Sequence, residues 1–175
     1  MPIGSKDFRK HSLTAPNGRF QLPRVVAFGV PVRMSVVALD LGARRIGIAV
    51  TDAAGMSAFP LGTIERRSFN ADLQAIRLTL GSRDIECLVV GLPVNMDGSE
   101  GPMARHARNF ATRLASALKI EVKLQDERLS SFEAEQRLRD EVPRGKKKAA
   151  IDAMAAAIIL ENYLESKRAR AKSSD

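Results

Sequence analysis

The chain has 175 residues, 45% of them apolar and 27% charged, with a formal net charge of +8. This length suits one domain rather than two, and no apolar run approaches the roughly 18 to 20 residues that a membrane span needs. One cysteine and two histidines are too few for a structural zinc site, which usually takes four such ligands, so oxygen atoms would have to hold any metal.

The first 33 residues differ from the rest in composition. They hold six Lys and Arg residues against one acid, a net charge of +5, and contain four prolines and three glycines without a helical or strand period. We predict an irregular basic extension at 1–33; a start codon assigned too early, with Met34 as the true first residue, explains it at least as well. The remaining chain is only mildly basic, so binding to a polyanion must rest on local clusters.

From Ser35 onward, short apolar runs alternate with turns. The runs 36–41, 46–51 and 59–64 predict three strands, and the short connections between them favour an antiparallel meander.

Two helix–strand pairs follow the meander. Apolar residues recur at helical spacing in 70–80 and again in 103–117. The run 85–90 is apolar almost throughout, which indicates a strand buried on both faces, and 122–124 is the next strand. Cys87 lies in the first of these two strands, where it acts as a small buried hydrophobe without a disulfide partner; this suits a reducing compartment, and we expect a cytoplasmic protein.

Two predicted helices end the chain. Ser130 stands three residues before a glutamate, the spacing of a capping box, and predicts a helix that ends near Asp140. The last helix, about 149–165, is apolar on all sides and should be buried. The order βββαβαβαα predicts an α/β domain over 34–166, with a mixed five-stranded sheet flanked by helices, and a basic tail at 167–175.

Two aspartates stand in apolar surroundings, where a charge needs a partner. Asp40 lies at the end of the first strand, on the same face as Val36 and Ala38. Its alternative role is that of a turn residue that accepts backbone N–H groups. Asp152 is followed one turn later by apolar residues, and its alternative role is that of a first-turn acid that interacts favourably with the helix dipole.

Glu127 directly follows the strand at 122–124, at a strand exit where site residues are common. A surface glutamate paired with Arg128 is the alternative. Three acids at the ends of separate buried elements can converge on divalent ions, and oxygen ligands suit Mg²⁺ or Mn²⁺. Asp40, Glu127 and Asp152 are therefore candidate metal ligands and catalytic residues of a site in which two ions would activate water for attack on a phosphodiester.

Four blocks of the sequence resemble the signature blocks of the YqgF family, in order and at compatible spacing over residues 34–166. The blocks are Ala38–Gly42 with Ile46–Ala49, Val89–Gly98, Asp126–Ser130, and Ile151–Ala153 with Ala156 and Ile158–Leu160. The second block, with Gly-Leu-Pro-x-Asn-Met-Asp-Gly, is highly specific.

The resemblance implies a ribonuclease-H-like fold, related to that of the RuvC Holliday junction resolvases, and a nuclease that acts on the 5′ end of pre-16S rRNA in bacterial cytoplasm. It also implies metal-binding acids at Asp40, Glu127 and Asp152. In resolvases the second acid follows the strand equivalent to 85–90, whereas this chain has a Gly-Leu-Pro sequence at 91–93. Glu127 would therefore substitute from the adjacent strand.

Residues outside the acid trio are candidates for substrate binding. The resemblance implies that the loop that carries Asn95, Asp97 and Gly98 forms a rim of the substrate groove. The basic candidates rest instead on their charge and on their place in the chain. The basic candidates are Arg44, Arg105, Arg108, Arg128, Lys146, Lys147 and Lys148. A solvated basic face is the alternative for each, and no aromatic stripe that would stack on single-stranded bases is present.

The expected partner is a nucleic acid, either pre-16S rRNA or branched DNA as for a Holliday junction resolvase, with ribosomal particles as a further candidate. Monomer and homodimer both stay open. Two other functions compete. Leu39–Gly42 also resembles the first phosphate loop of actin-like ATPases and sugar kinases, but those proteins clamp ATP between two lobes, each about the size of this domain. A non-catalytic RNA-binding module, in which the acids are caps and turn residues, is the second.

Overall fold

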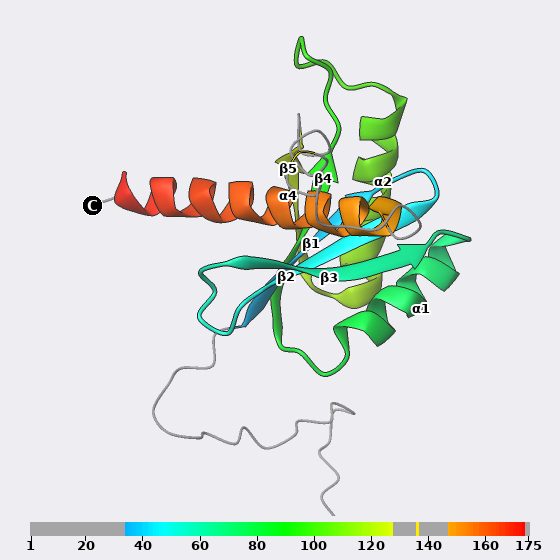
Figure 1. Cartoon of the computed structure of the whole chain (residues 1–175). Coiled ribbons are helices and arrows are strands. Elements are labelled where there is room, and N and C mark those ends of the chain that lie inside the picture. The colour runs from blue at the N-terminus through cyan, green and yellow to red at the C-terminus, as the bar shows by residue number, and fades with distance from the viewer. Residues whose placement is uncertain (1–33, 128–135, 137–146, 174–175) are drawn as a thin grey trace, which may run out of the picture. The chain divides into compact units, whose positions relative to one another are not determined.

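The computed structural model describes residues 34–127, 136 and 147–173. The predicted extension at 1–33 and nearly all of the predicted helix that begins at Ser130 lie outside them. The described elements are β1 (Ser35–Leu41), β2 (Arg45–Thr51), β3 (Ala58–Glu65), α1 (Phe69–Leu80), β4 (Ile85–Leu92), α2 (Pro102–Leu118), β5 (Glu121–Asp126) and α4 (Lys147–Lys172) (Figure 1).

The strands form one mixed sheet in the order β3-β2-β1-β4-β5. The first three pair as the predicted antiparallel meander, whereas β4 and β5 run parallel to β1. The parallel pair β4 and β5 needs a crossover connection, which α2 provides. The α/β class and the mixed five-stranded sheet expected from the sequence are confirmed.

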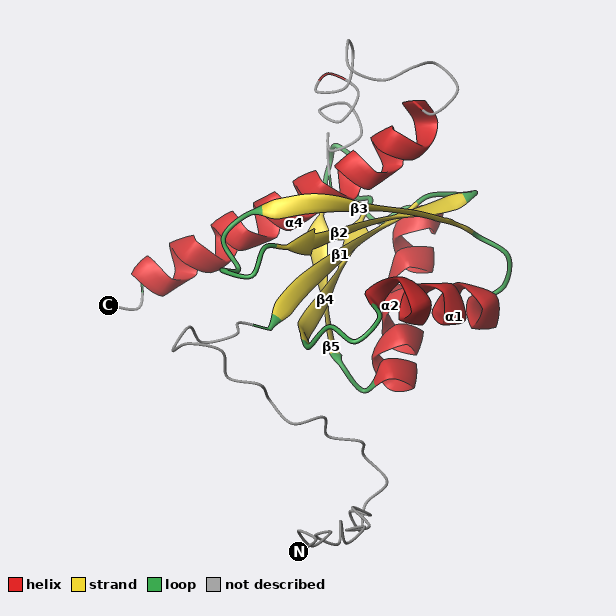
Figure 2. Cartoon of the chain, turned by 60° about the horizontal axis from the view of Figure 1, so that its bottom comes forward, coloured by secondary structure: helices red, strands yellow, loops and turns green. Residues whose placement is uncertain are grey.

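Helices cover both faces of this sheet (Figure 2). On one face, Val37 and Leu39 enter the core that α1 and α2 close; on the other, Val36 and Ala38 enter the core that α4 closes. Successive residues of β1 thus enter different cores because side chains alternate along a strand. The same alternation places Asp40 on the α4 face.

Helix α4 is longer than the sequence indicates. It runs from Lys147 to Lys172 instead of ending near residue 165, so the tail predicted from residue 167 is helical through residue 172. Lys167 pairs with Glu86 of β4 at 2.5 Å. The middle of the helix is buried, as predicted from its all-round apolar character. No helix in the described part of the chain is long and apolar enough to cross a membrane.

The backbone of α4 lies directly against β2 at Gly47. A Cβ atom built on Gly47 would lie closer than 3.0 Å to the backbone carbonyl of Asp152, a distance that real Cβ atoms essentially never show. Gly47 is also the cross-strand partner of Asp40. The missing side chain at residue 47 therefore brings the Asp152 segment of α4 next to the end of β1.

We expect Gly47→Ala to lower the free energy of unfolding by about 1–3 kcal/mol, because the added methyl group meets backbone atoms that cannot rotate away. Urea unfolding measures the change. Gly101→Ala is the matched control, since a Cβ there would lie 3.8 Å from its nearest neighbour, an ordinary contact. Equal destabilisation by the two substitutions would contradict the close approach.

Candidate active site

The three predicted acids come from three different elements. Asp40 is the penultimate residue of β1, Glu127 directly follows β5, and Asp152 lies on α4. The carboxyl ends of parallel strands meet at one edge of a sheet, which brings Asp40 and Glu127 to the same edge. The N–H group of Glu127 donates to the carbonyl oxygen of Leu92 at 3.3 Å, which ties the exit of β5 to the end of β4.

Electrostatic effects connect Asp40 with each of the other two acids. Burial raises the pKa of Asp40 to about 6, and the nearby charge of Asp152 contributes to this rise. Burial also raises the pKa of Glu127 to about 8, with the charges of Asp40 and Asp126 adding to the effect. Asp40 therefore interacts electrostatically with both Asp152 and Glu127.

The space for the Glu127 carboxylate exists because residue 91 is a glycine. A Cβ built on Gly91 would overlap with Oε2 of Glu127, closer than any real Cβ contact, and would also crowd Cδ1 of Ile159. From the resemblance we expected Glu127 to replace, from the adjacent strand, the acid that resolvases carry after the strand equivalent to β4. Here β4 has no side chain at residue 91, and the carboxylate of the adjacent strand fills the same region.

Asp152 has a partner that sequence reasoning missed. Nε of Arg45 donates to Oδ2 of Asp152 at 2.5 Å, and the two side chains are 23% and 25% exposed. Arg45 shares a strand face with Gly47 and Ala49, which face α4, and this places its guanidinium beside Asp152. The alternative considered for Asp152, that it is an acid in the first turn of its helix, is wrong. Helix α4 begins at Lys147, and its first turn holds no acid.

The trio fits a divalent cation by residue type and placement. Burial raises the pKa of Asp40 and of Glu127, so a nearby cation would favour their charged forms, and hard cations prefer oxygen ligands. Within residues 34–127, 136 and 147–173, no three His, Cys, Asp or Glu side chains stand in a ready-made metal-binding group. The assignment of Asp40, Glu127 and Asp152 as ligands therefore stays a prediction.

The polar side chains of the loop between β4 and α2 form hydrogen bonds with other residues of the same loop. Nδ2 of Asn95 donates to Oγ of Ser99 at 2.8 Å, and Oδ1 of Asp97 accepts from the N–H of Ser99 at 2.9 Å. Gly98 adopts a φ of +82°, which favours glycine. These contacts show that Asn95, Asp97 and Gly98 stabilise the turn itself. Met96, in the same turn, is 76% exposed. Binding of substrate by Asn95, Asp97 or Gly98 stays a prediction.

The basic residues predicted to bind substrate differ in their exposure and in their ion pairs. Arg44 and Lys148 have exposed side chains, and Lys147 lies in the first turn of α4. Arg108 forms an ion pair with Glu100, so its charge is already partly neutralised. Arg128 and Lys146 lie outside the described residues. His106 is exposed, and its Nε2 atom lies 2.7 Å from Nη2 of Arg66.

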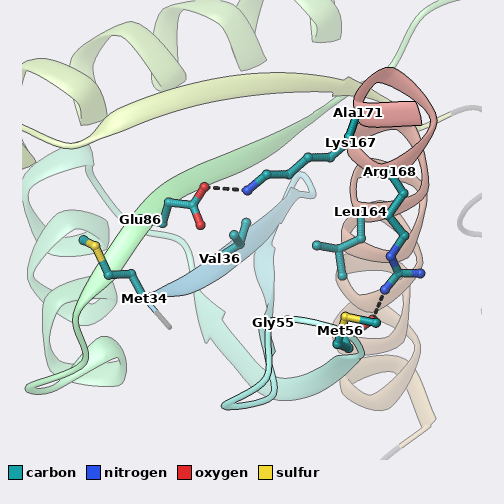
Figure 3. A pocket seen from close by; sticks show the side chains of 9 residues that line it. All are labelled: Met34, Val36, Gly55, Met56, Glu86, Leu164, Lys167, Arg168 and Ala171. Atoms are coloured by element: carbon teal, nitrogen blue, oxygen red, sulfur yellow. Dashed lines mark hydrogen bonds and ion pairs between the residues drawn. The ribbon is translucent and has the colours of Figure 1, made fainter. Parts of the chain in front are cut away.

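A concave region of about 420 Å³ lies elsewhere, at the amino ends of β1 and β4 (Figure 3). Its lining comprises Met34, Val36, Gly55, Met56, Glu86, Leu164, Lys167, Arg168 and Ala171. None of the predicted site residues is among them. Because Asp40 is near the carboxyl end of β1, this hollow and the acid trio lie at opposite edges of the sheet.

Comparisons with known proteins agree with the sequence resemblance. The RuvX family, described as Holliday junction resolvase, matches residues 34–166. A protein of Trichormus variabilis named "Putative pre-16S rRNA nuclease" is 44% identical over 142 residues, 81% of this chain and 94% of that protein. A protein of the same name from Anaeromyxobacter sp. is 47% identical over 137 residues, 78% of this chain and 100% of its own length.

Among solved structures, the RuvC protein of T. thermophilus in complex with a Holliday junction substrate is similar, with a TM-score of 0.48 and 14% identity. The alignment covers 78% of this chain and 96% of that one.

The acid trio predicts an unusual pH dependence of stability in metal-free protein. A carboxyl group whose pKa is raised on folding keeps its proton in the folded state after the unfolded chain has released it, so stability falls as pH rises through that window. For Asp40 the window runs from 3.8 to about 6, and for Glu127 from 4.5 to about 8. Urea unfolding in EDTA across these windows measures the decline.

Two variants separate the contributions. Glu127→Gln should remove the part of the decline that lies between about pH 6 and 8, whereas Asp40→Asn should act mainly below about pH 6. A decline above pH 6 that is the same in wild type and Glu127→Gln would show that Glu127 does not titrate in this range.

Proposed function

Since the chain belongs to the RuvX family, which is the YqgF family of the sequence resemblance, we propose that it is a nuclease that processes the 5′ end of pre-16S rRNA. Asp40, Glu127 and Asp152 are its catalytic carboxylates in this proposal. The observation that supports it is that β1, the exit of β5 and α4 each supply one acid, and that Asp40 interacts electrostatically with Asp152 and with Glu127. We place this activity in the cytoplasm.

The trio supplies the ligands for Mg²⁺ or Mn²⁺, for which the sequence predicts two ions. When bound, such cations supply the Lewis acidity that activates water and stabilises the leaving oxygen of the phosphodiester. Asp40 contributes its carboxylate from the centre of the trio, because its charge is coupled to both other acids. Arg45 holds the Asp152 carboxylate in place through the ion pair on the α4 face.

The two alternative functions have less support than the nuclease proposal. In a module whose acids served only as caps and turn residues, Asp152 would lie in a first turn and Glu127 would be exposed; the structure has neither. Cleavage of branched DNA is the nearest rival, because the family description names Holliday junctions. The names of relatives at 44% and 47% identity favour RNA as substrate.

Wild-type protein with Mg²⁺ or Mn²⁺ should cleave a pre-16S rRNA 5′-leader fragment, and EDTA should abolish cleavage. Asp40→Asn should reduce the rate by at least about 100-fold, because it removes a direct ligand, and even outer-shell partners of metal ligands contribute 10- to 100-fold. Asp84→Asn, the same chemical change at an exposed position before β4, is the control and should keep the wild-type rate.

A four-way DNA junction is the comparison substrate in the same assay. Faster cleavage of the junction than of the RNA leader would replace the ribosomal assignment with resolution of DNA branches. Equal rates for wild type and Asp40→Asn would refute the carboxylate mechanism for both substrates.

Gly91→Ala should reduce cleavage about as much as Glu127→Gln, roughly tenfold or more, because the new Cβ takes the space of the Glu127 carboxylate. Circular dichroism and urea unfolding check that the variant is folded. Gly101→Ala serves as the control, since its Cβ meets no close neighbour. Wild-type activity in Gly91→Ala would show that catalysis does not require Glu127 to lie against residue 91.

A further inference from the structure

The loop between β4 and α2 projects from the end of the sheet (Figure 1). Val94 and Glu100 pair across it as an antiparallel bridge. At its tip, the N–H group of Gly98 donates to the carbonyl oxygen of Asn95 at 2.8 Å, which is the hydrogen bond of a four-residue turn. Met96 is the second residue of this turn and therefore stands at its corner.

Hydrogen bonds fix the shape of the loop at its tip and at its base. The N–H group of Asn95 donates to the carbonyl oxygen of Ser99 at 2.9 Å, in addition to the bond between their side chains. At the base, both carboxylate oxygens of Glu100 accept from Nε of Arg108, at 2.8 and 3.0 Å. A partner that contacts Met96 thus meets a backbone that is already ordered, which lowers the entropy cost of binding.

The turn itself does not account for the methionine. Its hydrogen bonds come from the residues around Met96, and polar residues, glycine and proline are usual at such corners. The Met96 side chain is nevertheless 76% exposed. A single exposed apolar residue is common on protein surfaces, and Leu78 of α1 is 81% exposed. Met96 differs from Leu78 in its place on a projecting, hydrogen-bonded tip.

The base of this loop adjoins the predicted acids. The carbonyl oxygen of Leu92 accepts from the N–H groups of both Glu127, at 3.3 Å, and Val94, at 3.0 Å. Met96 follows Leu92 by four residues, so their backbones lie within about 14 Å of each other, the reach of an extended chain. Stacked DNA rises about 3.4 Å per nucleotide of one strand. The tip can therefore reach bases a few nucleotides from a phosphate held at the acids.

The charge at the tip favours contact with bases over contact with phosphates. Hydrogen bonds from Ser99 hold the pKa of the neighbouring Asp97 carboxyl group below its usual range, so this group is negatively charged at neutral pH and repels phosphate. The apolar side chain of Met96 instead gains when it leaves water. Methionine is one of the apolar side chains that nucleic-acid-binding proteins insert between base steps, and unstacking costs least where bases are unpaired.

We propose that Met96 is a wedge that inserts between two bases where a paired stretch of RNA meets an unpaired one, beside the bond to be cleaved. This inference rests on the proposed function, because it takes structured RNA as the substrate and the acids as the place of cleavage. Met96 then selects the substrate by the ease of separating two stacked bases, and not by their sequence.

Fluorescence of 2-aminopurine, placed in turn at each position around the cleavage site of the RNA leader, measures unstacking without a nuclease assay. Full-length Asp40→Asn protein is used with Mg²⁺, so that the RNA is bound and not cut. Fluorescence should rise at one position beside the cleavage site. Adding Met96→Ala should remove the rise, whereas Met96→Leu should keep it because leucine is also apolar and similar in size. Leu78→Ala, the matched control at an exposed apolar residue of α1, should keep it as well.

Cleavage by otherwise wild-type protein gives the second measurement. Met96→Ala should lower kcat/KM on the structured leader about tenfold, as the loss of a base-stacking contact does, and leave cleavage of an unstructured strand unchanged. A fluorescence rise that Met96→Ala retains, or that Leu78→Ala also loses, would overturn the wedge while leaving the nuclease proposal intact. A rise that depends on Met96 in a protein whose wild type cuts no RNA would instead support the wedge and refute the proposed nuclease.

Discussion

The contact between Gly47 and the backbone of Asp152 decides how the rest of the site is arranged. Helix α4 can lie on the sheet only as closely as the residues beneath it allow, and a glycine at residue 47 lets backbone meet backbone. Because Gly47 is paired with Asp40 across the strands, the closest approach of the helix occurs beside that acid. The strands alone would place Asp40 and Glu127 together; the third acid depends on this one contact.

The face of the sheet that α4 covers buries apolar side chains at one end and carboxylates at the other. Toward the amino ends of β1 and β4, small and apolar side chains such as Ala38 and Ala49 pack against α4. Toward the carboxyl ends the packing gives way to Asp40, Glu127 and Asp152, whose charges must be offset within partly buried surroundings. The apolar part supplies the stability that allows the acidic part to remain under electrostatic strain.

Much of this arrangement follows from local sequence patterns. Apolar periodicity and composition predict the meander, the strand β4 buried on both faces and the buried last helix. The apolar surroundings of Asp40 and Asp152 likewise indicate that the charge of each carboxylate needs a partner. The start of α4 was misplaced because the apolar run begins after Lys147 and Lys148, although lysine and alanine are good helix formers and extend the helix toward the amino end.

Two features of the site depend on three-dimensional register and could not be predicted. Arg44 and Arg45 look alike in a turn sequence, and only the pairing of β2 decides which of them faces α4. Likewise, the burial of Glu127 depends on the space beside Gly91 of the neighbouring strand β4. No repeat of apolar residues in β4 or β5 predicts this contact. The loop residues Asn95 and Asp97 show the opposite case, in which a distinctive motif is accounted for by hydrogen bonds within its own turn.

The overlap between a Cβ at residue 91 and the carboxylate of Glu127 also limits how such a site can be redesigned. The space beside β4 admits either a side chain on residue 91 or the carboxylate of Glu127, but not both. Moving the carboxylate onto residue 91 would require shortening residue 127 in the same step, and either change alone would leave the region overfilled or without its acid. The two positions therefore behave as a single designable unit, in which one strand gives up a side chain so that its neighbour can provide the charge.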